Sequence, residues 1–208
     1  MRLLIFGATG GTGRNAVSQA LEKGYHITAF VRDPTALAIK NKNLTLIQGN
    51  VLNLKDVQEA VKGQDIVISV LGNKTKDALW KSSTIISDGV KNIIAAMKTN
   101  KVKRLLFVAS FGVNTNIFLP EKLFIRIVLK NIFADIPKQE ALIKASGSDW
   151  TIVHPARLIN TPRTGKYQHG VDLPIGLSSK IARSDVADFL LKSIEDTAVV
   201  GKTITLSY

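Results

Sequence analysis

The stretch that decides the fold is Leu3-Leu4-Ile5-Phe6-Gly7-Ala8-Thr9-Gly10-Gly11-Thr12-Gly13. Its first four residues form an apolar run whose length fits only a buried strand. After the glycines, apolar residues recur at helical spacing until Gly24. A glycine-rich turn lets backbone approach a phosphate, and the first N–H groups of the following helix then meet the anion. The stretch therefore predicts a nucleotide-binding turn built from Gly7, Thr9, Gly10, Gly11, Thr12 and Gly13.

The rest of the first half alternates short apolar runs with helical patterns. Strands are expected at 26–31, 44–47, 65–70 and 104–109, with a short helix beginning at 36–39, a helix around 57–61 and a long helix over 78–99. Near-continuous apolar strands between helices indicate a parallel sheet that is covered on both faces. Right-handed crossovers then give the doubly wound α/β nucleotide-binding fold, the Rossmann fold.

The second half is less regular. A helix is predicted at 138–146, a strand at 150–154, a last helix with Ser184 as its N-cap, and a terminal strand at 203–206. Residues 119–133 form an apolar stretch with basic residues every four positions. This pattern favours a helix with one solvent-exposed basic face over a membrane-surface helix or a lid. Residues 160–178 are rich in proline and glycine, so we expect a loop that contacts substrate. Residues 1–208 are interpreted as one domain with a small C-terminal substrate side.

Composition narrows the class of protein. The formal charge of the 208 residues is +12, but the basic residues are scattered, which favours a general attraction for anions over sequence-specific nucleic-acid binding. The absence of cysteine excludes a thiol nucleophile and a thiolate metal site, and the three histidines lack metal-ligand spacing. No apolar run approaches the ~20 residues needed to cross a bilayer. A cytoplasmic protein without a metal is expected.

The residue after the second strand predicts the cofactor. Ligands of such sheets bind at the carboxyl ends of the strands, and the second strand ends at Arg32. An arginine there suits the 2′-phosphate of NADP, whereas an acid would hold the 2′-hydroxyl of NAD. The neighbouring Asp33 is such an acid, but it is better explained as a helix N-cap followed by Pro34. NADPH is therefore favoured over NADH.

Other strand ends add candidate cofactor residues. Asn50 follows the third strand, where its amide would bond the adenine edge or serve only as a turn residue. The fourth strand ends in Leu71-Gly72-Asn73, which we expect at the same ligand edge. His154, in the sixth strand, is interpreted as a strand residue with a satisfied ring rather than as a catalyst.

These motifs carry a family resemblance. The glycine turn, Val31-Arg32-Asp33, Gly49-Asn50-Val51, Leu71-Gly72 and the strand ending at Pro155 resemble the atypical short-chain dehydrogenase/reductases. Within them the chain is most similar, over nearly its whole length, to the NmrA-like group and to the flavin reductase/biliverdin-IXβ reductase proteins. The resemblance implies an NADPH-dependent reductase of flavins or similar acceptors.

The chain also departs from that family. Asn50 stands where an acid is usual, and none of the three tyrosines has a lysine four residues on. Lys138 occupies the place of the family's catalytic lysine, with Ala134 where the tyrosine would be. By the same alignment Ser110 matches a catalytic serine, and Arg157 stands where a substrate-pocket histidine is found. Either residue could contact the acceptor. The alternative is that the Ser110 hydroxyl only bonds to backbone and that Arg157 is only a surface charge.

The missing tyrosine shapes the expected reaction. A simple ketone needs a positioned acid when it is reduced, whereas a conjugated acceptor leaves a delocalised anion that water can protonate. The expected function is hydride transfer from NADPH to a flat acceptor such as a flavin, a quinone or a tetrapyrrole. The alternative is an NmrA-like redox-sensing regulator that binds NADP(H) without turnover and signals through a protein partner. A nucleotide-sugar epimerase or dehydratase fits poorly, because the proton-relay tyrosine is missing.

Overall fold

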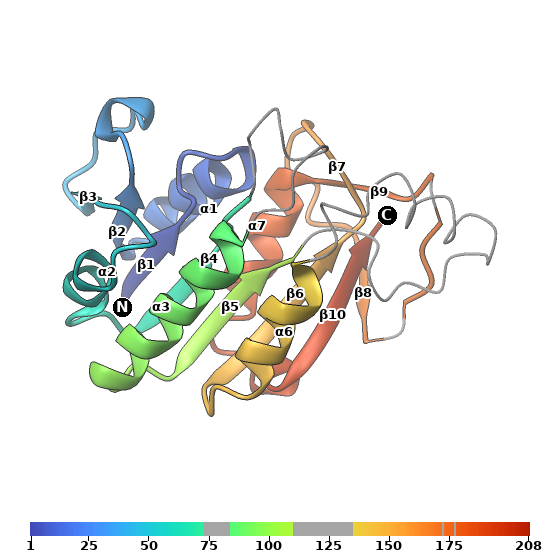
Figure 1. Cartoon of the computed structure of the whole chain (residues 1–208). Helices are drawn as coiled ribbons and strands as arrows, with labels where there is room; N and C mark the ends of the chain where they lie inside the picture. The colour runs from blue at the N-terminus through green and yellow to red at the C-terminus, as the bar shows by residue number, and fades with distance from the viewer. Residues whose placement is uncertain (73–83, 110–134, 172, 177) are drawn as a thin grey trace.

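One mostly parallel sheet organises the molecule (Figure 1). The computed structural model describes residues 1–72, 84–109 and 135–208, apart from 172 and 177. Eight strands lie in the order β3-β2-β1-β4-β5-β6-β10-β8, and only β8 runs antiparallel to its neighbour. They are β1 (Arg2–Phe6), β2 (His26–Val31), β3 (Leu44–Gln48), β4 (Ile66–Ser69), β5 (Arg104–Val108), β6 (Asp149–Pro155), β8 (Gln168–Gly170) and β10 (Lys202–Ser207). This order confirms the predicted doubly wound fold.

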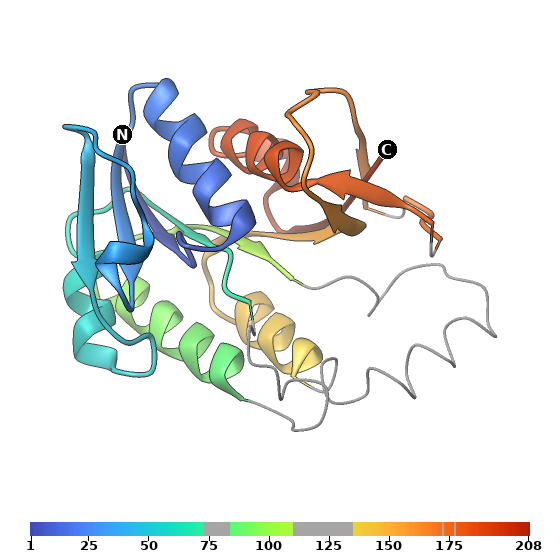
Figure 2. The ribbon, with the colours of Figure 1, turned by 90° about the horizontal axis from the view of Figure 1, so that it is seen from above.

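Helices cover both faces of the sheet (Figure 2). On one face lie α1 (Gly11–Glu22) and α7 (Arg183–Lys192), which contact each other. On the other face lie α2 (Leu54–Val61), α3 (Ile85–Thr99) and α6 (Ile136–Lys144). Among the helices of the described residues, none is long and apolar enough to cross a membrane. The part of the predicted 78–99 helix before residue 84, and the whole of 119–133, fall outside the described residues.

The two faces of the sheet bury separate apolar clusters. Alternation along β1 sends Leu3 and Ile5 into the cluster that contains residues of α1 and α7. Leu4 and Phe6 enter the opposite cluster, with residues of α2, α3 and α6. All four side chains are completely buried. The strand is therefore apolar at every interior position because both of its faces are covered.

Two sequence-based expectations about helices are corrected. The last helix starts at Arg183 with Ala182 as its N-cap, because the Ser184 hydroxyl instead donates to the carbonyl of Thr161, 2.9 Å away. The short helix after the second strand is a 3₁₀ turn, η1 (Pro34–Ala36), that ends before Leu37. Another 3₁₀ turn, η3 (Thr197–Val199), precedes β10.

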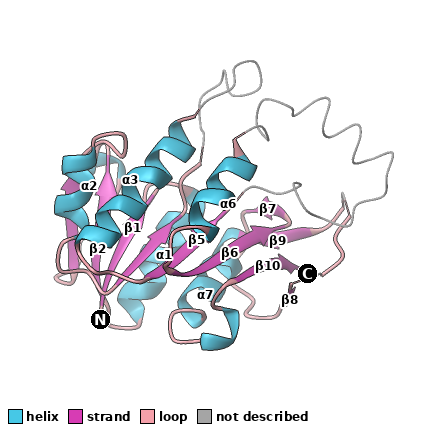
Figure 3. Cartoon of the chain, turned by 60° about the horizontal axis from the view of Figure 1, so that its bottom comes forward, coloured by secondary structure: helices cyan, strands magenta, loops and turns pink. Residues whose placement is uncertain are grey.

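The predicted loop over 160–178 contains β8, and it is flanked by a small parallel pair, β7 (Arg157–Ile159) and β9 (Lys180–Ala182) (Figure 3). These strands have three residues each, too few for a periodic pattern in the sequence.

A buried ionisable pair holds α6 to β6. Glu140 Oε1 lies 2.8 Å from His154 Nε2, and Glu140 Oε2 lies 3.0 Å from Lys144 Nζ. Glu140 and His154 are only 4% and 2% exposed, so the expectation that the His154 ring is satisfied is confirmed. Burial alone would raise the pKa of Glu140, but the hydrogen bonds from His154 and Lys144 outweigh it and lower that pKa below its usual value.

Replacing this carboxylate tests its contribution to stability. We expect Glu140→Gln to lower the free energy of unfolding at pH 7 by about 1–3 kcal/mol, because a buried bond to a charged group is weakened. A carboxylate whose folded pKa is depressed stabilises above its unfolded pKa and loses that contribution as pH falls through the folded pKa. The difference between the two proteins should therefore be largest near neutral pH and shrink below about pH 4.5. Urea unfolding at several pH values measures it, and a difference that grows on acidification would contradict the assignment.

Candidate cofactor-binding site

The glycine turn is a tight crossing of backbone at the end of β1. Gly7 has a φ of +78°, and a Cβ there would lie 2.5 Å from the carbonyl oxygen of Val70. A Cβ on Gly13 would lie 2.2 Å from the carbonyl oxygen of Gly7. The Gly10 amide closes the turn by donating to that same Gly7 oxygen at 2.9 Å. A larger residue at position 7 would push the end of β1 away from the end of β4, and one at position 13 would push α1 away from the end of β1.

The first turn of α1 suits an anion. Its N-cap is Gly10, no side-chain hydrogen bond caps it, and no acidic residue lies in the first turn. The helix therefore presents its N-terminal amides and the positive end of its dipole at the surface of the turn. Gly10 itself is extended, with a φ of −74° and a ψ of 165°, a conformation that any residue adopts. A diphosphate group of a dinucleotide fits this cradle.

The end of β2 separates the roles of Arg32 and Asp33. Asp33 Oδ1 accepts hydrogen bonds from the Thr35 hydroxyl at 2.6 Å and the Thr35 amide at 2.9 Å. These two bonds lower the pKa of Asp33, and they confirm it as an N-cap followed by Pro34. The carboxylate is thus occupied by its own turn, while Arg32 is exposed beside it.

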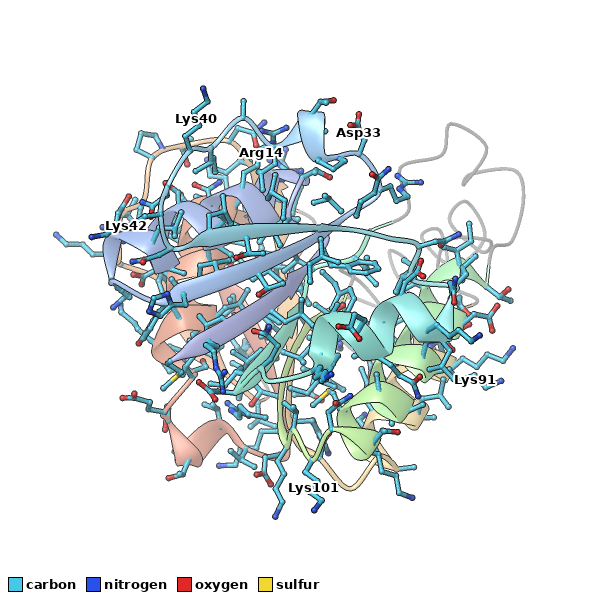
Figure 4. All side chains as sticks on the ribbon, turned by 90° about the vertical axis from the view of Figure 1, so that its left-hand side faces the viewer. Arg14, Asp33, Lys40, Lys42, Lys91 and Lys101 are labelled. Atoms are coloured by element: carbon cyan, nitrogen blue, oxygen red, sulfur yellow. The ribbon has the colours of Figure 1, made fainter. Side chains whose placement is uncertain are left out.

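Arg14 lies at the same place and was not singled out from the sequence. Its Nε donates to the carbonyl of Thr9 at 3.1 Å, and its guanidinium also donates to the carbonyl of Ala36. The side chain therefore ties the glycine turn to η1, with Arg14 and Asp33 on the same side of the molecule in Figure 4. Its signal in the sequence is its place directly after the last glycine, at the start of a helix where a cation is otherwise unfavourable.

Asn50 is a turn residue. Its side-chain oxygen accepts a hydrogen bond from the Leu52 amide at 3.0 Å, and its backbone N–H donates to Asp56 Oδ2 at 2.9 Å. This Asx turn occupies the oxygen and leaves the side-chain NH₂ group as the part that faces other partners. The turn interpretation is confirmed, and the contact with adenine stays a prediction.

A cleft of about 310 Å³ opens beside the turn, at the carboxyl ends of β4, β5 and β6. Most of its lining is apolar, and Leu71, Gly72 and Arg157 are among its residues as expected for the ligand edge. The described lining residues are Thr12, Val70, Leu71, Gly72, Val108, Ala109, Pro155, Ala156, Arg157, Leu158 and Arg183. Asn73 and Ser110 fall outside the described residues, and Lys138 is exposed on α6 and is not among the lining residues.

The three tyrosines lie elsewhere. Tyr167 donates to Asp188 at 2.9 Å, and Tyr208 donates to Asp185 at 2.6 Å. Burial and the neighbouring Asp188 raise the pKa of Tyr167, which makes it a poor proton donor. Tyr25 packs against the core beside α1. Among the residues described around the cleft there is neither a tyrosine nor a carboxylate.

Arg183 is the second residue that the sequence did not reveal. It is the first residue of α7, and its Cδ would lie 2.5 Å from a Cβ on Gly11. Its Nη1 donates to Asn160 Oδ1 at 2.8 Å. Arg183 thus joins α7, β7 and the glycine turn at one wall of the cleft. Nothing in the local sequence predicts this contact, because it joins residues that are 172 positions apart.

Known proteins share this architecture. The chain is 26% identical over 210 residues to an uncharacterized sugar epimerase, YhfK, of Bacillus subtilis, covering all of this chain and 94% of that one. It is 26% identical over 227 residues to phenylcoumaran benzylic ether reductase PT1 of Pinus taeda, covering 99% and 68%. A Rossmann-fold NAD(P)-binding protein from Shigella flexneri has a TM-score of 0.78 at 26% identity, covering 99% and 92%.

Other relatives are longer than this chain. It spans 61% of a chloroplastic Arabidopsis thaliana protein and 32% of a 3-beta-hydroxysteroid dehydrogenase of Mycolicibacterium neoaurum. The NAD(P)H-binding family matches residues 7–197, from the first glycine of the turn to the start of η3. That match takes in the turn, the end of β2 and every described residue of the cleft. Relatives of this chain include proteins named as a reductase and a dehydrogenase. The chain therefore belongs to the NAD(P)H-binding family.

Proposed function

We propose that this protein is an NADPH-dependent reductase that transfers hydride to a flat conjugated acceptor: a flavin, a quinone or a biliverdin-like tetrapyrrole. One observation carries the proposal. The apolar cleft beside the glycine turn contains, among its described residues, no tyrosine or carboxylate that would act as a proton donor. Such a site suits an acceptor that does not need an acid from the protein.

The chemistry balances without a protein acid. Bound NADPH would provide the hydride and become NADP⁺, the acceptor would receive it on its conjugated system, such as a flavin ring nitrogen or a tetrapyrrole bridge, and water would provide the one proton. The chain's own residues hold the two flat groups against each other and exclude water between them, which is catalysis by proximity and orientation. Val70, Leu71 and Leu158 offer the apolar walls for this purpose. Arg157, exposed at the cleft, and Ser110, the residue after Ala109, are proposed to contact the acceptor.

The names of the relatives support a reductase more than an epimerase. The Pinus taeda relative is a reductase, while the Bacillus subtilis relative carries the name of a sugar epimerase. By the resemblance noted above, an epimerase uses a tyrosine as proton relay. In this structure Tyr167 and Tyr208 are both bonded to aspartates of α7 and neither lines the cleft. The same geometry argues against reduction of simple ketones.

The proposed cofactor is NADPH rather than NADH. Arg32 is exposed at the end of β2, and Arg14 donates to the carbonyl of Ala36 in the 3₁₀ turn that follows it, so we place both guanidinium groups near the expected 2′-phosphate. Asp33, the acid that would favour NAD, is occupied by Thr35. We propose that the side-chain amide of Asn50 binds the adenine edge. The remaining proposed cofactor contacts are Leu71, Gly72 and Asn73, which follow β4, and Lys138 of α6.

A screen of acceptors tests the reaction. We expect steady NADPH oxidation with FMN, a quinone or a biliverdin, and negligible oxidation with simple ketones. Absorbance at the nicotinamide band reports the rate, and a protein-free mixture controls for direct reduction. Ser110→Ala should lower turnover by less than about tenfold, because no proton relay depends on it. Robust ketone reduction that this change abolishes would reverse the assignment. Tight NADPH binding with no turnover of any acceptor would favour the redox sensor.

The cofactor preference has its own test. We expect Arg32→Ala to weaken NADP⁺ binding by roughly tenfold or more and to leave NAD⁺ binding nearly unchanged, because a charge-assisted bond contributes about 1.5–3 kcal/mol. Calorimetric titration measures both affinities. Lys42→Ala is a matched control, since it removes an exposed positive charge from the loop before β3. Equal affinities of the unmodified protein for NADP⁺ and NAD⁺ would rule the preference out.

The turn is tested by filling it. A Cβ at Gly10 would lie 3.2 Å from the Gly7 carbonyl oxygen, and we expect the branches of Gly10→Val to obstruct the approach of a diphosphate to the turn. We expect NADP⁺ affinity to fall at least about tenfold. The melting temperature should drop by only a few degrees, since valine is a poor N-cap but the φ is ordinary. Gly176→Val is the control, because a Cβ there meets no atom within 4 Å. Undiminished NADP⁺ binding by Gly10→Val would show that the phosphates lie elsewhere.

A further inference from the structure

Arg183 places a positive charge against the N-terminus of a neighbouring helix, α1. Its Cδ and Nε would lie 2.5 and 3.0 Å from a Cβ on Gly11, so the side chain lies directly against the first residue of α1. That helix end has no side-chain cap and no acidic residue in its first turn. Arg183 is also the first residue of α7, whose first turn contains Asp185. A cation at a helix N-terminus is electrostatically unfavourable.

The described residues do not neutralise this charge. Within the described residues Nη1 donates to neutral oxygens, Asn160 Oδ1 at 2.8 Å and the Leu158 carbonyl at 3.5 Å, and the ion pairs there do not include Arg183. The nearby acid of α7, Asp185, is occupied by Tyr208, Thr164 and Gly165. The arrangement therefore holds a partly buried guanidinium group at the cleft by neutral acceptors, with its charge uncompensated by any carboxylate of the described residues.

We infer that Arg183 binds the nicotinamide-side phosphate of the cofactor diphosphate. Arg183 lines the cleft together with residues at the ends of β4, β5 and β6, on the side of the turn away from β2 and Arg32. The adenosine end of the cofactor lies toward β2, so the phosphate nearer Arg183 is the one attached to the nicotinamide ribose. The inference deepens the proposed function and rests on it.

The same contact explains Gly11. A Cβ at Gly11 meets only Arg183 within 4 Å, and no positive φ requires glycine there. Gly11 is therefore needed to admit the arginine stem, whereas Gly7 and Gly13 are needed for the backbone crossing itself. Arg183, which belongs to α7 in the C-terminal half of the chain, thus lies at the glycine turn, where it would bind the phosphate.

Two ligands test the assignment, because only one of them contains the nicotinamide-side phosphate and the nicotinamide riboside attached to it. NADP⁺ carries both phosphates of the diphosphate, whereas 2′,5′-ADP carries only the adenosine-side one. We expect Arg183→Ala to weaken NADP⁺ binding about tenfold or more, and 2′,5′-ADP binding by less than about twofold, in calorimetric titrations. Lys180→Ala removes an exposed positive charge three residues away and should leave both affinities within about twofold. Thermal melting of each variant checks that it is folded.

A double-mutant cycle with Gly11 gives a second readout. Gly11→Ala should weaken NADP⁺ binding several-fold in the unmodified chain, because its methyl group displaces Arg183. In the Arg183→Ala background the space is open, and the same change should cost less than about twofold. Additive losses, equal losses for NADP⁺ and 2′,5′-ADP, or an Arg183→Ala variant that binds NADP⁺ normally would each overturn the inference. Failure of the unmodified protein to bind NADP⁺ would instead overturn the proposed function together with it.

Discussion

The close contact between Gly13 and the carbonyl of Gly7 is the constraint on which the rest of the structure depends. A methyl group at position 13 would lie 2.2 Å from that oxygen, so α1 starts directly above the end of β1 only because both residues are glycine. The approach sets the path of α1 across the sheet and leaves its first amides at the strand ends. Both the packing of the first βαβ unit and the anion site follow from this one contact.

The C-terminal half completes the site through α7. Gln19 of α1 donates from its side-chain amide to the Ser184 carbonyl at 2.9 Å, and Ser184 donates in turn to Thr161. Asp185 fixes the loop between β7 and β8 by accepting hydrogen bonds from the backbone amides of Thr164 and Gly165 at 2.9 and 2.8 Å. These bonds hold the loop between β7 and β8 against α1 and α7, the two helices next to the glycine turn. The cleft is thus bounded by two halves of the chain that are locked together by polar contacts.

Charge is distributed in keeping with an anionic ligand. The chain carries a formal charge of +12, and the two arginines against the glycine turn, Arg14 and Arg183, are held by neutral groups rather than by carboxylates. Arg14 uses the carbonyls of Thr9 and Ala36, and Arg183 uses Asn160 and Leu158. Neutral acceptors orient a guanidinium group while leaving its charge uncompensated, which raises the local potential that attracts phosphate. Asp33 is instead held by its own turn, and Asp185 accepts hydrogen bonds from Thr164 and Gly165 of the loop between β7 and β8.

The sequence by itself determined the fold and the position of the cofactor turn, because both follow from local patterns. Apolar runs, helical spacing and glycines at the first strand end each act within a few residues, and so does the Asp33 cap. Only the tertiary structure decided the roles of Arg14, Arg183 and Ser184, since each depends on a partner that the chain brings close after folding. The Ser184 prediction was wrong for this reason: its hydroxyl meets the Thr161 carbonyl, a partner invisible in the local sequence. The short strands β7, β8 and β9 also arise only from pairing, because three residues are too few to carry a period.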